Sequence, residues 1–543
     1  MINHAPQPAA TRVLMVYPRF AAESFWAYRT SCEVVGARYP TAPLGLITVA
    51  ALLPSDWDVR LVNRNTEELT DDDITWADMV MTGGMLFQQA DAHRIIERAH
   101  ALGKPVVVGG PDVTSHPHQY EAADIRVLGE AEGVIDEFVA AWNAGTREGV
   151  FEAPKFQIDV TKTPIPRFDL LKFEHYMYVG VQYSRGCPFT CEFCDIIELY
   201  GRVPRTKTNA QMLAELDALH ALGYRGHVDF VDDNLIGNKK AVKQFLPELK
   251  GWLDAHGNPF EFSTEASLNL ADDDELMEMM RAANFFAVFV GIESPDTETL
   301  IQMKKKQNTR RSIPESIHRI YEYGMFVTAG FIVGFDSEKG SVAEPMIELI
   351  EDAAIPISMV GLLYALSETQ LGRRLAKEGR LHADHDRYKT GDGDHCTAGL
   401  NYDTLRPREQ ILDDYHAILD RIYDPQAFAA RLRRLSDLLD RSKSLGEAPE
   451  GDIKFKDGAY DAVQRILGQL PEARDALWGA LKYCVKTNPR AVRFIALMMA
   501  IYLHLGPYSR KVMGEIDRRR TAIGKAQPAV PVAPPAESLV PAG

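Results

Sequence analysis

Short apolar runs alternate with amphipathic segments through the first 150 residues. The apolar runs predict strands at residues 13–17, 59–62, 79–82 and 106–108, and helical spacing predicts helices at 44–53, 90–102 and 134–142. Short apolar strands that alternate with amphipathic helices are typical of a parallel sheet covered on both faces. In such a sheet, ligands bind at the carboxyl ends of the strands. The pattern therefore predicts an N-terminal Rossmann-like domain.

A second series of apolar runs follows at wider spacing. It predicts strands at residues 178–183, 227–231, 260–263, 286–290, 326–333 and 358–366, separated by helical segments such as 209–222, 239–255 and 274–282. Six strand–helix units predict a partial (βα)6 barrel, whose chemistry belongs at the carboxyl ends of the strands. From residue 371 onward the chain is charged and its pattern is helical.

These patterns define an α/β fold class with three folded parts. A chain of 543 residues is too long for one core. Pro164 and Pro166 mark the link between the first two parts. The predicted boundaries are a disordered start at 1–11, the Rossmann-like domain at 12–150, a linker at 151–172, the partial barrel at 173–370, a helical C-terminal domain at 371–526 and a disordered tail at 527–543.

Charge and cysteine usage indicate which partners and which cellular compartment to expect for the protein. The net charge is −16, from 60 basic and 76 acidic residues, which argues against nucleic acid or anionic lipid as the main partner. Residues 1–11 are polar and do not resemble a signal peptide. The six cysteines show no disulfide-framework spacing, which favours a reducing compartment. We therefore expect a cytoplasmic protein.

One apolar stretch, residues 494–505, leaves two interpretations open. Its twelve residues are fewer than the roughly twenty that span a bilayer. A buried helix is the favoured interpretation. A helix that dips into one face of the inner membrane is the alternative, and it would make the protein peripheral to that membrane.

Candidate chemistry is concentrated in residues 184–195, Ser-Arg-Gly-Cys-Pro-Phe-Thr-Cys-Glu-Phe-Cys-Asp. Cys187, Cys191 and Cys194 form a Cys-x3-Cys-x2-Cys loop, which can hold three irons of a [4Fe-4S] cluster and leave the fourth iron open. A zinc knuckle and a ferredoxin cluster are the alternatives, but both normally take a fourth protein ligand. The other three cysteines are scattered through the chain.

This loop, with Phe193 before its last cysteine, resembles the radical S-adenosylmethionine superfamily. The resemblance implies that S-adenosylmethionine chelates the open iron and is cleaved to a 5′-deoxyadenosyl radical. It also implies an S-adenosylmethionine site made of Phe193, Asp232 or Asp233, Glu265, Glu293, Ile332 and Gly334. Phe193 would stack on adenine, the carboxylates would bind the methionine and ribose groups, and the last two would act through their backbone. A core aromatic, a turn and structural ion pairs are the alternative interpretations.

The glycine-rich strand ends of the first domain, with Pro-Leu-Gly-Leu at 43–46, resemble the cobalamin-binding domain that precedes many such barrels. The resemblance implies cobalamin contacts from Thr82, Gly83, Gly84, Gly109, Gly110, Gly129 and Glu130. A structural layer without cofactor is the alternative.

Many cobalamin proteins carry Asp-x-His-x-x-Gly, but here Asp112 and His116 have a different spacing. We therefore expect cobalt without a histidine ligand.

The basic run at residues 303–311 is interpreted as a solvated face, with a phosphate-bearing substrate as the alternative.

Residues 183–208, 226–234 and 359–366 resemble the hopanoid C-2 methylases and their near relatives, within the cobalamin-dependent (class B) radical S-adenosylmethionine methylases. The resemblance implies methylation of an unactivated sp3 carbon of a polycyclic lipid. It implies methylcobalamin, two S-adenosylmethionine per turnover and a flavodoxin- or ferredoxin-type electron donor. Tetrapyrrole methylation or cyclisation and a cobalamin-binding sensor are the alternatives.

Overall fold

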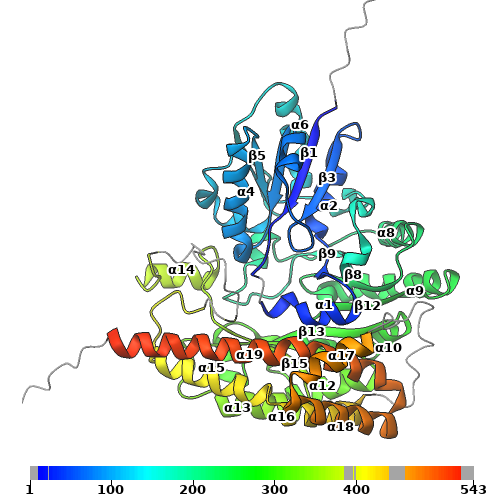
Figure 1. Ribbon diagram of the computed structural model, residues 1–543, viewed down its shortest axis with the longest axis vertical. Coiled ribbons are helices and arrows are strands. Elements are labelled where there is room, and N and C mark those ends of the chain that lie inside the picture. The colour runs from blue at the N-terminus through cyan, green and yellow to red at the C-terminus, as the bar shows by residue number, and fades with distance from the viewer. Residues whose placement is uncertain (1–9, 22–23, 384–395, 397–398, 440–458, 527–543) are drawn as a thin grey trace, which may run out of the picture.

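The computed structural model describes residues 10–21, 24–383, 396, 399–439 and 459–526. It contains two parallel sheets and a group of C-terminal helices (Figure 1). The N-terminal sheet, in blue, lies at one end of the molecule, and the C-terminal helices, in orange and red, pack across the other. Apart from residues 10 and 11, the segments predicted to be disordered, 1–11 and 527–543, lie outside the described residues.

The first sheet has six parallel strands in the order β3-β1-β4-β5-β6-β7. The strands are β1 (Arg12–Tyr17), β3 (Asp58–Asn63), β4 (Met79–Gly83), β5 (Val106–Gly109), β6 (Ile125–Leu128) and β7 (Gly149–Glu152). Alternation along β1 divides the core in two, because Val13 and Met15 pack on one face while Leu14 and Val16 pack on the other. The predicted strands and the Rossmann-like layer are confirmed, and β6 and β7 are additions.

Helices cover both faces of this sheet. They are α2 (Leu44–Leu52), α3 (Asp71–Trp76), α4 (Gln89–Ala101), α5 (Pro111–Ser115) and α6 (Ile135–Asn143). Ala50 of α2 and Phe138 of α6 join the cluster of Val13, whereas Ile74 of α3 and Ile95 of α4 join the cluster of Leu14. The carboxyl ends of these parallel strands point toward the second sheet (Figure 1).

The second sheet has seven parallel strands in the order β15-β14-β13-β12-β11-β8-β2. The strands are β2 (Tyr39–Thr41), β8 (Tyr176–Val181), β11 (Gly226–Phe230), β12 (Phe260–Glu265), β13 (Phe285–Glu293), β14 (Phe326–Val333) and β15 (Ile357–Leu362). The six predicted barrel strands are confirmed in sequential order. The last one ends at Leu362 instead of residue 366, and β2 joins the edge from the N-terminal part of the chain.

Helices pack on the outer face of this curved sheet. They are α8 (Asn209–Ala221), α9 (Lys239–Ala255), α10 (Asp274–Ala282), α12 (Ile313–Glu322) and α13 (Ala343–Asp352), with the shorter α7 (Ile196–Leu199), α11 (Thr297–Gln302) and α14 (Gln370–Lys377) in the loops. Val228 and Phe230 of β11 are buried on the outer side, where Phe230 contacts Phe245 of α9. Alternation then directs His227 and Asp229 to the inner face.

The described C-terminal part is helical, as predicted. It contains α15 (Arg408–Ile422), α16 (Pro425–Leu438), α17 (Ala459–Gly468), α18 (Pro471–Thr487) and α19 (Val492–Ala526). In the part of the chain that the structure describes, one helical segment, Pro489–Thr521, is long and apolar enough to cross a membrane, and 67% of its most apolar window is buried inside the molecule. Phe494 of α19 stacks on Phe286 of β13. Residues 494–505 therefore belong to a core helix.

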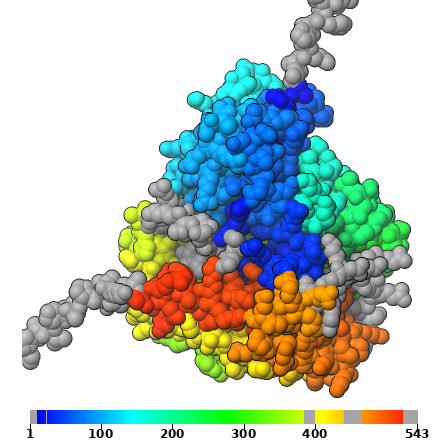
Figure 2. All heavy atoms as spheres, viewed as in Figure 1, coloured from blue at the N-terminus to red at the C-terminus, as the bar shows by residue number. Residues whose placement is uncertain are grey.

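The N-terminal segment between the two sheets packs against α19. Figure 2 shows the dark blue segment that holds α1 (Arg29–Val35) directly beside the red helix. The Ser31 hydroxyl donates to the Ala500 carbonyl at 2.9 Å, and Phe25 lies 6.4 Å from Tyr508 between ring centroids. Together these segments close the open side of the curved second sheet.

Candidate functional site

The three cysteines lie on one loop at the carboxyl end of the first barrel strand. The loop runs from β9 (Ser184–Arg185), just after the end of β8, to α7. Gly186 starts it with φ +94°, and a Cβ there would lie 2.9 Å from the Gly201 carbonyl oxygen. Only glycine adopts this conformation in so little space. The backbone therefore positions Cys187 at the strand end.

Side-chain amides approach two of these sulfurs. Asn234 Nδ2 lies 4.0 Å from Cys187 Sγ, and Gln307 Nε2 lies 3.8 Å from Cys191 Sγ. All three thiols are free, and burial raises the pKa of each of them, so that a thiolate here needs a nearby positive centre. Among the described residues, no three His, Cys, Asp or Glu side chains converge on one metal ion. In a cubane cluster each thiolate binds a different iron, so the loop fits a [4Fe-4S] cluster.

A cavity of about 590 Å³, hereafter the cofactor cavity, opens beside this loop between the two sheets. The N-terminal sheet contributes the loops after β4 and β5, with Phe87, Pro111 and His116 among the lining residues. The barrel contributes Cys194 and the inner ends of several strands. The carboxyl ends of the two sheets therefore face one shared space.

Four of the residues expected to bind S-adenosylmethionine line this cavity, namely Phe193, Asp233, Glu293 and Ile332. Gly334 does not line it. Its N–H donates to Glu338 Oε1 at 2.9 Å, and its carbonyl accepts from the Tyr402 hydroxyl at 2.7 Å. Glu265 lines a different cavity, deeper in the barrel.

The two adjacent aspartates after β11 have different surroundings. Asp232 is fully buried and accepts from the Tyr183 N–H at 2.9 Å and the Ser184 hydroxyl at 2.5 Å. Burial raises its pKa to about 7. Asp233 accepts from the Gly186 N–H at 2.9 Å and faces the cofactor cavity, where burial raises its pKa to about 6. Asp232 thus holds the start of the cysteine loop, and Asp233 reaches both the loop and the cavity.

The interpretation of residues 303–311 as a solvated face is wrong for part of the run. Lys305 is buried, and its Nζ lies 2.5 Å from Glu293 Oε1 and 5.8 Å from the centroid of the Phe193 ring. Asn308 is also buried and donates to the Gly291 and Ile292 carbonyls. Lys306 remains exposed. The run folds back over the cysteine loop because Glu293 offers Lys305 a buried partner.

Thr82 to Gly84, and Gly109 with Gly110, lie at the base of the two loops that line the cavity, after β4 and β5. Gly129 and Glu130, after β6, are not among its lining residues. Gly83 and Gly109 pack together, since a Cβ on Gly83 would lie 2.3 Å from the Gly109 oxygen. Gly110 has φ +96° and Gly129 has φ +80°, both in the left-handed region. The Thr82 hydroxyl donates to the Val16 carbonyl at 2.8 Å. Gly84 continues into the lining loop at Met85.

Glu130 is not open to the cavity in this structure. Its two carboxylate oxygens form ion pairs with Arg185 at 2.9 Å and Arg205 at 2.8 Å. Glu132 pairs with Arg185 at 2.7 Å. Glu130 and Glu132, which follow β6, therefore join the N-terminal domain to the segment that starts the cysteine loop. Nothing in the sequence pattern indicated these ion pairs, because each arginine lies more than fifty positions from its partner.

His116 is buried beside the cofactor cavity, and both of its ring nitrogens have hydrogen-bond partners. Nδ1 lies 2.9 Å from Asp112 Oδ1, and Nε2 lies 3.0 Å from the Ser367 hydroxyl. Asp112 also accepts from the Tyr120 hydroxyl at 2.6 Å. The histidine therefore links a loop of the first sheet to the segment that follows β15.

Family models match three consecutive parts of the chain. These are a B12 binding domain at residues 33–139, the Radical SAM superfamily at residues 181–350 and a domain of unknown function, DUF4070, at residues 369–518. The first two matches coincide with the sheet that carries the glycine-rich loops and the sheet that carries the cysteine loop.

Similar proteins extend these matches. The hopanoid C-2 methylase of Rhodopseudomonas palustris (strain TIE-1) is 38% identical over 538 residues, covering 96% of this chain and 98% of that protein. An uncharacterized methyltransferase of Synechocystis sp. is 45% identical over 422 residues, 77% of each chain. The bacteriochlorophyllide d C-12(1)-methyltransferase of Chlorobaculum tepidum is 25% identical over 64% of this chain and 76% of that protein.

A solved structure shares the fold across both sheets and the C-terminal helices. The cobalamin-dependent S-adenosylmethionine radical enzyme OxsB, with aqua-cobalamin and S-adenosylmethionine bound, matches with a TM-score of 0.59 at 14% identity, covering 94% of this chain and 80% of that one. The matched domains, the three-cysteine loop and the similarity over nearly full length lead to one conclusion. The chain belongs to the cobalamin-dependent radical S-adenosylmethionine methyltransferases.

Proposed function

We propose that this protein methylates C-2 of a hopanoid, an unactivated sp3 carbon of a polycyclic lipid, and uses two S-adenosylmethionine per turnover. The observation that supports this substrate is the extent of similarity to the hopanoid C-2 methylase, which includes the C-terminal helices. The bacteriochlorophyllide relative matches only 64% of this chain. Because the C-terminal helices close the barrel, a relative that shares them is the better guide to what the barrel encloses.

In this proposal the cysteine loop holds the [4Fe-4S] cluster through Cys187, Cys191 and Cys194. Asn234 and Gln307 donate weak hydrogen bonds to two of the sulfurs, which stabilises thiolate charge. Asp232 and Asp233 accept from the backbone on either side of Arg185 and so fix the angle at which the loop leaves the sheet.

Phe193, Asp233, Glu293 and Ile332 bind S-adenosylmethionine from the walls of the cofactor cavity. The Lys305 ammonium lies 5.8 Å from the centroid of the Phe193 ring, and its ion pair with Glu293 holds it there. Gly334 acts at a distance, by anchoring the end of β14 to Glu338 and Tyr402. Cobalamin is bound by the loops that follow Gly84 and Gly110, with Thr82, Gly83, Gly109 and Gly129 supporting them from the strand ends.

The bound cluster, S-adenosylmethionine and methylcobalamin supply hydrogen-atom abstraction and methyl transfer. The contribution of the chain is to bring the two sheets' carboxyl ends to one cavity, to exclude water and to align the substrate carbon. Reduction requires a flavodoxin- or ferredoxin-type donor. We place the reaction in the cytoplasm, with a lipid substrate delivered from the inner membrane.

The proposal is tested under anaerobic conditions with the reconstituted enzyme, reductant, S-adenosylmethionine and diplopterol. We expect a singly methylated hopanoid together with 5′-deoxyadenosine and S-adenosylhomocysteine, detected by mass spectrometry. If 5′-deoxyadenosine forms without a methylated lipid, the radical chemistry stands and the hopanoid substrate is wrong.

A tetrapyrrole substrate is the second candidate, because the bacteriochlorophyllide methyltransferase is also a relative. The same assay with a chlorophyllide distinguishes the two by product mass, since methylation and oxidative cyclisation change the mass differently. A sensor role would require a purified protein that retains cobalamin but takes up no iron after reconstitution.

A further inference from the structure

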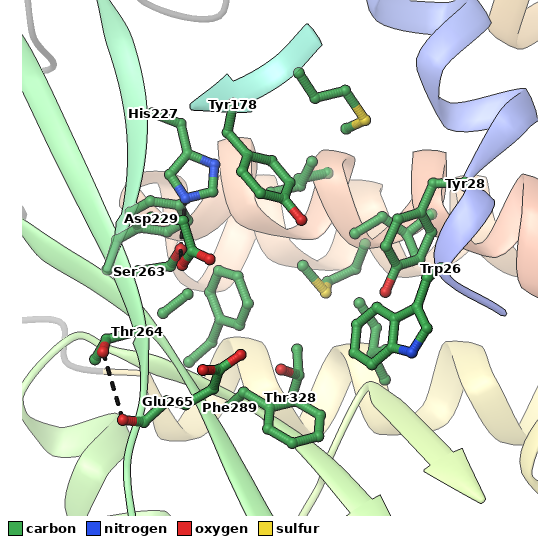
Figure 3. Close-up of a pocket in the computed structure, with 18 of the residues that line it drawn as sticks. Trp26, Tyr28, Tyr178, His227, Asp229, Ser263, Thr264, Glu265, Phe289 and Thr328 are labelled. Carbon is green, nitrogen blue, oxygen red and sulfur yellow. Dashed lines mark hydrogen bonds between the residues drawn. The ribbon is translucent and has the colours of Figure 1, made fainter. Parts of the chain in front are cut away.

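A second cavity, of about 340 Å³, lies inside the barrel (Figure 3). We call it the barrel chamber. Its walls are the inner faces of β8, β11, β12, β13 and β14, and it is closed by α19 and by the segment at Trp26 and Tyr28. The lining is mainly aromatic and aliphatic, with Tyr178, Phe286 and Met498 as examples. Such a lining suits an apolar ligand.

One wall of the barrel chamber carries a chain of polar side chains. The Ser263 hydroxyl donates to Asp229 Oδ1, and His227 Nε2 lies 2.6 Å from Ser263 Oγ. Because the hydroxyl proton is directed at Asp229, the histidine nitrogen is the donor to Ser263. Burial lowers the pKa of His227 to about 3, so the imidazole is neutral. The inward alternation of β11 and β12 places all three side chains on this wall.

Glu265 ends the same wall and points into the chamber (Figure 3). Within the described residues its carboxyl group has no hydrogen-bond partner, and the lining contains no Lys or Arg. Burial raises the pKa of Glu265 well above its ordinary value, and the negative charge of Asp229 adds to this effect. The wall thus offers an acid that can donate at Glu265 and a carboxylate that can accept at Asp229.

A hydroxyl group is the ligand group that matches this pair, because it both donates and accepts one hydrogen bond. A ligand without such a group leaves buried polar groups unpaired, which weakens its binding. An ammonium group would instead favour two ionised carboxylates, and the pair would have to release a proton to bind it.

The barrel chamber and the cofactor cavity are neighbouring spaces that share one lining side chain. Phe289 lines both spaces, and its ring packs 5.9 Å from the Trp26 ring centroid. Gly330 makes room for it, since a Cβ there would lie 3.1 Å from Phe289 Cζ. A long rigid ligand with one end in the chamber and the other near Cys194 would have to pass Phe289.

We infer that the barrel chamber holds the end of the substrate remote from the methylated carbon, and that Asp229 and Glu265 recognise a hydroxyl group there. This inference rests on the proposed function and deepens it, because it assigns the substrate class as a rigid apolar alcohol. It also moves Glu265 from the cofactor to the substrate, where it acts as a specificity-determining residue.

The test measures equilibrium binding to the reconstituted full-length protein without reductant, so that no turnover occurs. The probes are diplopterol, the hydrocarbon hopane, which lacks the hydroxyl, and an amine of the same skeleton. We expect the alcohol to bind at least about tenfold more tightly than the hydrocarbon. In Glu265→Leu this preference falls to less than about threefold, whereas Glu265→Gln, which still donates and accepts, retains most of it.

Glu322→Leu, an exposed glutamate on α12, is the matched control and should keep the wild-type preference. If Glu265→Leu does not fold, the wild-type comparison of alcohol with hydrocarbon decides alone. Equal binding of alcohol and hydrocarbon would overturn the inference. Tighter binding of the amine than of the alcohol would also overturn it, in favour of a cation site.

The outcomes separate this inference from the proposed function. Alcohol-selective binding without methylation of diplopterol would disprove hopanoid C-2 methylation and leave the assignment of the chamber intact. Methylation of diplopterol without any preference for the alcohol over the hydrocarbon would confirm the function and disprove the role of Asp229 and Glu265.

Discussion

Arg185 of β9 and Glu132 of the loop after β6 form a two-point ion pair, with Nη2–Oε1 at 2.7 Å and Nη1–Oε2 at 3.1 Å. Their side chains are 12% and 8% exposed, so water screens the pair only weakly. Burial raises the pKa of Glu132, but the bonds and charge of Arg185 outweigh that effect, and the pKa is lowered overall. Arg185 lies two residues before Cys187. The same side chain thus fixes the domain interface and the start of the cysteine loop.

Removing Arg185 should destabilise the protein strongly. Arg185→Met leaves Glu130 and Glu132 with fewer partners in a buried place, and we expect a loss of about 3–5 kcal/mol in the free energy of unfolding. Urea denaturation measures it. Arg167→Met is the matched control, because Arg167 forms a similar pair with Asp169 that is 39% and 48% exposed, and it should cost less than about 1 kcal/mol.

The contribution of Glu132 should depend on pH. Because its folded-state pKa is lowered, its stabilisation is present above the unfolded-state pKa and is lost as the pH falls through the folded-state value. The stability difference between wild type and Glu132→Gln should therefore be largest near neutral pH and shrink below about pH 4. A difference that stays constant from pH 7 down to about pH 2 would show that the ion pair does not carry it.

Replacing any cysteine of the loop should abolish the cluster. Cys187→Ala, Cys191→Ala and Cys194→Ala each remove one of the three ligands, and we expect iron and sulfide well below four per chain after anaerobic reconstitution. Cys484→Ala is the control, since Cys484 is buried in α18 away from the loop. Full iron content in any of the three loop variants would contradict the assignment of that cysteine.

The strands were predictable because their apolar runs are continuous, as parallel strands covered on both faces require. The segments Val13 to Val16 and Phe326 to Val333 are such runs, and neither shows the spacing of apolar residues that an amphipathic helix has. Strands β6 and β7 have four residues each, and three of the four in β7 are exposed, so no such run exists there. Strand β2 was missed because three residues carry no period, and its pairing with β8 is set by the tertiary fold.

The site was predictable where one loop carries it, and less so where distant strands build it. The spacing of the three cysteines is local, so their loop follows from the sequence. Asp232 and Asp233 are adjacent and point to opposite sides, and which side is the cavity depends on the packed sheet. Lys305 lies in a basic run whose composition indicates solvent, and only the buried Glu293 reverses that expectation.

Lys305 should be far more important for stability than its neighbour Lys306. Lys305→Met leaves Glu293 buried without its partner, and we expect a loss of about 3–5 kcal/mol in the free energy of unfolding. Lys306→Met, on the exposed side of the same run, should change it by less than about 0.5 kcal/mol. The double variant Lys305→Met with Glu293→Gln should recover part of the loss. Equal effects of the two single variants would disprove the burial of Lys305.

His116 should have no bond to cobalt. Its Nδ1 faces the Asp112 carboxylate and its Nε2 faces the Ser367 hydroxyl, so both nitrogens are engaged away from a metal. Because Asp112 accepts from Nδ1–H, Nε2 is the acceptor from Ser367. The electron paramagnetic resonance spectrum of the cob(II)alamin-loaded protein should therefore lack splitting from a nitrogen ligand, and His116→Leu should leave the spectrum unchanged. His118→Leu, on the exposed side of the same loop, is the control. Nitrogen splitting that is present in wild type and lost only in His116→Leu would show that the histidine leaves Ser367 to bind the metal.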